Sequence, residues 1–196
     1  MSVVRFRLWA YSYLLNKEVK LSKKNIILLF FLVLSLIYCD IYKAFKENKV
    51  IIEFLNNQFS SWNEKEDKII NKYNTIIVGK NFTSENLWLE LNKNILPKAL
   101  ELRENINFYQ SNNKEIIEVK KIYLEKIDIM IEGLDLIKRG FEKKDNPDFN
   151  LIYRGRDKIS VVNSYNKIIN EKIQKIIKDY YIKSDQIKKE IINKKT

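Results

Sequence analysis

The chain contains no histidine, and its 196 residues include only one cysteine, two prolines and four glycines. So few glycines and prolines exclude a fold built on many tight β-turns. Without histidine there is no Ser–His or Cys–His nucleophile pair and no histidine-bound metal site. One cysteine cannot build a cysteine-rich metal site, and four isolated glycines do not make a phosphate-binding loop. These absences predict a non-enzymatic protein with no metal and no cofactor.

Apolar residues make up 45% of the chain and charged residues 31%, a composition typical of a densely helical protein. From residue 50 onward the apolar residues recur every three or four positions, which is the spacing of one face of an α-helix. Four segments carry such stripes: 52–76, 88–109, 116–141 and 159–180. In the first of them, Glu66 is the only polar member. The 116–141 stripe is the strongest, and its members are Ile116, Val119, Tyr123, Ile127, Met130, Leu134, Ile137 and Phe141.

Turn-forming residues separate these stripes. A helix is expected to begin near Thr83 or Ser84, Pro97 should kink or restart it, and Asn112-Asn113 offers a turn and a cap. The sequence 145–148 contains Pro147 and predicts another turn, after which the last helix should run from about residue 148 to near residue 195. Arg154-Gly155-Arg156 is a candidate break near its start. The predicted fold is all-α: an antiparallel bundle of three to four long amphipathic helices.

The N-terminal part of the chain carries an apolar run at 26–39 that ends at Asp40 and follows Lys20, Lys23 and Lys24. A basic cluster before a run of about 14 apolar residues is typical of a signal peptide. Cys39, the only cysteine, is the last residue of the run, and the sequence Leu36-Ile37-Tyr38-Cys39 resembles a bacterial lipobox. That resemblance implies that Cys39 is acylated and becomes the mature N-terminus.

Tyr38 departs from the lipobox pattern, which has Gly, Ala or Ser at that position. A single-pass anchor and a cleaved secretory signal therefore stay open as alternatives. A start at Leu21 would leave a compact signal, so we interpret 1–20 as a gene-model extension. The predicted organisation is a basic N-terminal region at 1–24, a signal or anchor segment at 25–39 and a helical bundle domain at 40–196. Six basic residues precede the apolar run and three follow closely, which predicts an extracytoplasmic body at the cell membrane.

The net charge of the chain is +11, and most of it belongs to the C-terminal part. A basic surface on the last helix is predicted for Lys167, Lys172, Lys175, Lys178, Lys183 and Lys188. Such a surface attracts anionic lipids, acidic polymers or nucleic acid, although a solubilising helix face explains the same pattern. Only six of the 36 basic residues are arginine, which argues against sequence-specific recognition of nucleic acid.

Two pairs of acids, Glu125 with Asp128 and Glu132 with Asp135, are spaced to share a helix face. Lysines surround both pairs, so we interpret them as a charge-balanced surface. The sequence therefore predicts a membrane-anchored envelope lipoprotein whose bundle binds a protein or envelope partner, with pairing of two copies also open. The alternative is a membrane-tethered cytosolic module that binds an acidic partner or nucleic acid through its basic C-terminal helix.

Overall fold

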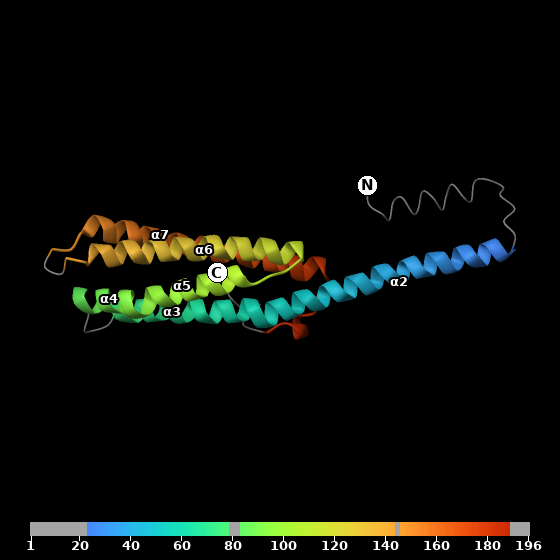
Figure 1. Ribbon diagram of the computed structural model, residues 1–196, viewed down its shortest axis with the longest axis horizontal. Coiled ribbons are helices and arrows are strands. Elements are labelled where there is room, and N and C mark those ends of the chain that lie inside the picture. Colours follow the sequence, from blue (N-terminus) through green and yellow to red (C-terminus); the bar gives the residue numbers. More distant parts are fainter. Residues whose placement is uncertain (1–22, 79–82, 144–145, 189–196) are drawn as a thin grey trace. The chain divides into compact units, whose positions relative to one another are not determined.

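The computed structural model describes residues 23–78, 83–143 and 146–188, and within these ranges all regular structure is helical (Figure 1). The predicted basic N-terminal region, except Lys23 and Lys24, and the predicted gene-model extension lie outside the described residues. The chain forms two compact units, one ending at Phe45 and the other beginning at Lys46. The elements are α2 (Lys23–Glu53), the π-helical segment η1 (Phe54–Phe59), α3 (Ser60–Val78), α4 (Ser84–Glu90), the π-helical segment η2 (Leu91–Ile95), α5 (Leu96–Phe108), α6 (Lys114–Gly140), α7 (Phe149–Asp179) and the 3₁₀ turn η3 (Ser184–Gln186).

The second unit is a helical bundle with two layers, in which α6 and α7 form one layer and α3, α4 and α5 form the other (Figure 1). Because η1 and η2 continue their neighbours without a break, the described chain has four helices. The all-helical prediction is thereby confirmed. α6 is the central element, since it packs against both α5 and α7.

Side-chain caps start three of the helices at the predicted places. Thr83 accepts a hydrogen bond from the backbone N–H of Asn86, at 3.1 Å. The Asn113 side chain accepts from the first two backbone N–H groups that follow Lys114, and the Asp148 side chain does the same at the start of α7. Each cap satisfies a backbone donor that has no partner inside its helix.

Pro97 restarts the second helix as predicted. It lies in the first turn of α5, directly after the π-helical segment η2. Proline has no N–H to donate to the preceding turn, and its ring crowds the carbonyl there. The wider π turn accommodates this, because the N–H of Leu96 bonds to the carbonyl of Leu91, five residues earlier.

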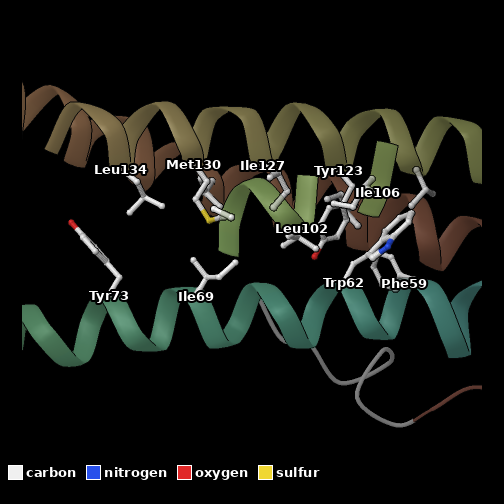
Figure 2. Packing of buried hydrophobic residues seen from close by; sticks show 14 of the residues in the cluster. Phe59, Trp62, Ile69, Tyr73, Leu102, Ile106, Tyr123, Ile127, Met130 and Leu134 are labelled. Atoms are coloured by element: carbon white, nitrogen blue, oxygen red, sulfur yellow. The ribbon is translucent and has the colours of Figure 1, made fainter. Parts of the chain in front are cut away.

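The core lies between the two layers. All eight members of the 116–141 stripe are buried, which confirms the prediction for this helix. Figure 2 shows Ile127, Met130 and Leu134 of α6 facing Ile69 and Tyr73 of α3 across the core. Each fully buried aliphatic side chain of this kind contributes about 1.5–3 kcal/mol to folding.

α6 and α7 approach each other through glycine. A Cβ atom added to Gly133 would lie 2.8 Å from the carbonyl oxygen of Gly155, and a Cβ added to Gly155 would lie 2.5 Å from the carbonyl oxygen of Gly133. Both distances are shorter than real contacts allow, so the two backbones can touch only because both residues lack a side chain. Gly155 thus lies inside an unbroken helix, where it permits close packing.

The last helix is shorter than predicted. α7 ends at Asp179 rather than near residue 195, and Tyr181 adopts a left-handed backbone conformation with φ of 52°. The chain then turns, and Ile182 and Ile187 are buried in the core. The helical pattern of the sequence continues past residue 180, so tertiary contacts override it here.

The first unit consists, as far as it is described, of the N-terminal part of α2. Its large apolar side chains are exposed on all sides of the helix: Phe30, Phe31, Leu32, Val33, Leu34, Leu36, Ile37, Tyr38, Ile41, Tyr42 and Phe45. Among the residues described, no helix is both long enough and apolar enough to cross a bilayer. The membrane anchor predicted from the sequence therefore has no support from the fold and stays a prediction.

Candidate functional site

A polar cluster lies inside the bundle, between α3 and α6. Glu66 and Lys126 are each 1% exposed, and the Lys126 Nζ atom is 2.5 Å from both carboxylate oxygens of Glu66. The Tyr123 hydroxyl donates a hydrogen bond to Glu66 Oε2, also at 2.5 Å, and lies 3.1 Å from Asn63 Oδ1. The carboxylate therefore has one charged and one neutral donor, so that burial leaves it fully partnered.

The electrostatics of this cluster keep Tyr123 neutral. Burial, followed by the negative charge of Glu66, raises the pKa of the Tyr123 hydroxyl well above its ordinary value. The Lys126 ammonium lies 4.7 Å from the centre of the Tyr123 ring, where a cation is attracted to the ring face. Tyr123 is thus held as a hydrogen-bond donor throughout the physiological pH range.

Aromatic side chains cover the polar cluster on one side. Tyr123 contacts the rings of Phe59 and Trp62, with ring centres 5.9 and 5.5 Å apart. Phe54 and Tyr109 extend the group, with their ring centres 5.6 Å apart. Figure 2 shows Phe59 of η1 and Trp62 of α3 pointing toward Tyr123 of α6. These rings exclude water from the ion pair and join the two layers of the bundle.

The cluster is closed to solvent, and its role is to hold α3 and α6 together. Two charged groups that are 1% exposed cannot touch a dissolved substrate without unfolding of the bundle. Within the described residues, no group of cysteine, aspartate and glutamate side chains could hold a metal ion. Sequence reasoning noticed Glu66 as the one polar member of its stripe, but it did not find Lys126 as its partner.

Three of the four acids in the predicted pairs on α6, namely Asp128, Glu132 and Asp135, form surface ion pairs. Asp128 pairs with Arg103 of α5 at 2.5 Å, and Glu132 pairs with Lys158 of α7 at 2.8 Å. Asp135 and Lys138 form a further pair at 2.9 Å within α6. These contacts agree with a charge-balanced surface at Asp128, Glu132 and Asp135, whereas Lys126, which the sequence placed on that surface, is buried.

The six lysines of the predicted basic surface do not lie on one helix. Lys167, Lys175 and Lys178 are exposed on α7. Lys172 leans toward α6 and forms ion pairs with Glu115 and Glu118, of which the first has a length of 2.6 Å. The remaining two, Lys183 and Lys188, come after the end of α7.

Cys39, the predicted lipid attachment site, is a free and exposed cysteine in the N-terminal unit. It lies within α2, which continues on both sides of it without a break. Its neighbour Tyr38 is 69% exposed, so bulky apolar side chains are on the surface beside the thiol.

A contact that sequence reasoning missed holds the C-terminal segment 182–188 against α2 and η1. The Asn56 side chain donates to the carbonyl oxygen of Gln186 at 2.8 Å and accepts from the N–H of Lys188 at 2.9 Å. The Asn48 side chain donates to the carbonyl oxygen of Tyr180 at 3.0 Å. The only sequence signal for a break in the helix was Ser184-Asp185, a pair of residue types that favour turns.

Comparison with family models, with curated proteins and with solved structures finds no match to this chain. The functional argument therefore rests on the chemistry of the described residues. Two features carry it: the apolar surface around Cys39 in α2 and the surfaces of the helical bundle.

Proposed function

We propose that this protein is a non-enzymatic envelope protein that is anchored to a membrane near Cys39 and binds a protein or another envelope component through its helical bundle. The supporting observation is the exposed apolar surface of α2. The large apolar side chains between Phe30 and Phe45 are 40–69% exposed and occupy every side of the helix. A helix that is apolar all round needs an apolar environment, and a bilayer supplies one.

The pattern of charges before this surface supports a membrane as that environment. Lys20, Lys23 and Lys24 precede the apolar run, as the basic region of an export signal does. An acyl chain on Cys39 would add a second attachment to the apolar side chains, and two attachments together give stable anchoring. Under the single-pass alternative, the same run stays in the membrane without modification of Cys39.

The interior of the bundle supports binding over catalysis. Its only buried charged groups, among the residues described, are Glu66 and Lys126, and they satisfy each other. The charged side chains available to a partner are on the surface, where Lys167, Lys175 and Lys178 are exposed. Such a surface suits an acidic partner.

Intact-mass spectrometry of the native protein, extracted from membranes, tests the anchor. A mass that begins at a diacylated Cys39 is expected, and Cys39→Ala should prevent both the cleavage and the acylation. A mass that retains residues 22–38 without acyl chains would replace the lipoprotein with a single-pass anchor. Recovery of the wild-type protein from the soluble fraction, with no acyl chain, would overturn the membrane proposal itself.

Protease treatment of spheroplasts tests the side of the membrane. Degradation of the bundle while a cytosolic marker stays intact is expected for an extracytoplasmic body. Protection of the bundle until the membrane is lysed would instead favour the cytosolic module. The exposed lysines of α7 are the observation behind that second candidate. Replacing Lys167, Lys175 and Lys178 with glutamate should then release its acidic partner.

A further inference from the structure

The end of α7 has the hydrogen bonds of a Schellman motif. The N–H of Ile182 bonds to the carbonyl of Ile177 at 3.0 Å, and the N–H of Tyr181 bonds to the carbonyl of Lys178 at 3.2 Å. This motif requires a left-handed residue, and glycine usually occupies that position. Here it is Tyr181, whose φ is 52° and whose side chain is 91% exposed. A tyrosine strains the backbone at this position, and its exposed ring gains no burial in return.

The docked segment compensates for this strain. Ile182 and Ile187 are 7% and 4% exposed and belong to the hydrophobic core. Between them the chain makes one tight turn, closed by the hydrogen bond from the N–H of Gln186 to the carbonyl of Lys183 at 3.0 Å. The segment therefore presents two aliphatic side chains five positions apart to the bundle.

Asn56 recognises the backbone of this segment. Its amide bonds to the carbonyl oxygen of Gln186 and to the N–H of Lys188, so that the two hydrogen bonds enclose Ile187. An asparagine amide that donates and accepts in this way imitates a peptide group. Asn56 lies within the π-helical segment η1, and π turns frequently occur at functional sites.

We propose that this face of α2 and η1 is a binding site for a short peptide segment, that residues 182–188 are its displaceable occupant, and that the same segment of a second copy of this chain takes that place in a dimer. The hinge is Tyr181. The local sequence favours continuation of α7, whereas the docked state needs a strained turn. Opening at Tyr181 relieves the strain, and a short strained hinge is the feature that favours exchange of identical segments between copies.

A second copy of the chain is the occupant that supplies the same contacting groups. Its segment brings the same two isoleucines to the core and the same backbone groups to Asn56, whereas the hydrogen bond from Asn48 to Tyr180 lies before the hinge and is not exchanged. Exchange therefore keeps the contacts of residues 182–188 and changes only the hinge. This inference does not depend on the proposed membrane anchor.

A peptide-binding experiment on the full chain tests the site. Ile182→Asp with Ile187→Asp should undock the chain's own segment and leave the site intact. The probe is a fluorescein-labelled peptide with the sequence of residues 180–188. In the folded double variant we expect at least about tenfold tighter binding than in wild type, since the tethered segment competes at high effective concentration. Adding Asn56→Ala should weaken binding about tenfold, because two hydrogen bonds are lost.

The control probe is the same peptide with aspartate in place of both isoleucines, and it should not bind. Circular dichroism and thermal melting establish that the double variant is folded. Absence of binding to the folded variant would overturn the site, and so would equal binding of the two probes.

Two hinge variants test the exchange, and they also serve where the double variant does not fold. Tyr181→Gly removes the strain of the closed turn, whereas the matched Tyr181→Ala retains it. Donor- and acceptor-labelled chains, each labelled at Cys39, are mixed, and energy transfer between them is followed. We expect about fivefold less transfer for the glycine variant than for the alanine variant. Hydrogen exchange at the Lys188 amide should be slower in Tyr181→Gly than in Tyr181→Ala by a similar factor, because the closed form is then more populated. Equal transfer in the two variants would overturn segment exchange.

Discussion

The two faces of α6 show two different ways of joining helices. Toward α3, contact is made through long side chains, with the Glu66–Lys126 ion pair and the Tyr123 ring between the backbones. Toward α7, the Gly133 and Gly155 backbones meet with no side chain between them. The α3–α6 interface keeps the two helices apart, and the pairing of charges sets their register. The α6–α7 interface brings the two helices together, and the fit of the glycine backbones sets their register.

The difference predicts opposite responses to substitution. For a buried ion pair, stability falls most when one partner is removed, because the other charge is left buried and unpaired. For a glycine contact, stability falls most when an atom is added, because two packed backbones leave no space for it. Truncation should therefore damage the α3–α6 interface, and enlargement should damage the α6–α7 interface.

Removal of one charge from the α3–α6 interface is expected to have the largest effect. Glu66→Ala or Lys126→Ala should each lower the free energy of unfolding by about 3–5 kcal/mol, measured by urea denaturation. The double substitution Glu66→Leu with Lys126→Met should restore most of the loss, because no charge is then left unpaired. A double variant as unstable as either single variant would show that the pair contributes net stability.

Adding a methyl group to the α6–α7 interface should have a smaller effect than removing one of the buried charges. Gly155→Ala should lower the free energy of unfolding by about 1–3 kcal/mol, although alanine is the better helix former. The matched control is Ser164→Ala on the exposed side of α7, which should be neutral or slightly stabilising. If Gly155→Ala instead stabilises the protein as the control does, the two backbones do not approach each other as closely as the structure shows.

Alkaline titration separates the hydrogen bond of Tyr123 from its packing. Because the pKa of Tyr123 is raised in the folded protein, its contribution is fully present below the ordinary tyrosine pKa of about 10. Above that pH the unfolded chain ionises first, so stability falls by up to about 1.4 kcal/mol per pH unit. Tyr123→Phe should remove this part of the slope and cost about 1.5–3 kcal/mol at pH 7. Identical slopes between pH 9 and pH 11 would contradict the assignment.

A partly exposed group of ion pairs between α6 and α7 should have the smallest effect. Lys172 bonds to Glu115 and Glu118, and these contacts raise the pKa of Lys172 and lower that of Glu118. The Lys172, Glu115 and Glu118 side chains are 17%, 32% and 59% exposed, so water reaches these pairs and Lys172→Ala should cost only about 1 kcal/mol. The loss should shrink further in 1 M salt, whereas Lys167→Ala should show no such dependence. An effect as large as that of Lys126→Ala would remove the contrast between buried and exposed pairs.

The amphipathic pattern predicted much of the fold. Thr83, Asn113 and Asp148 cap helices near the places where the chain composition indicated them, and Pro97 restarts the second helix. Every residue that the pattern assigned to the stripe on α6 is buried. It succeeded there because the helical period and local capping depend on residues close together in the chain.

The candidate site could be predicted only in part. Glu66 stood out as a polar residue in an apolar stripe, but its partner Lys126 is 60 residues away and has no local signal. Gly155 suggested a break, whereas its use is the contact with Gly133 of another helix. Cys39 and its apolar surroundings remain a prediction about the membrane, which the helical bundle does not test.

The sequence by itself determined that the chain is helical, where most helices begin and which face of each is apolar. These properties follow from periodicity, capping residues and proline, all of which act over a few residues. Only the tertiary structure decided the partner of Glu66, the glycine contact between α6 and α7, and the end of α7 at Asp179, just before the left-handed Tyr181. The local sequence favours a longer helix there, and docking of Ile182 and Ile187, together with the hydrogen bonds of Asn48 and Asn56, overcomes that preference.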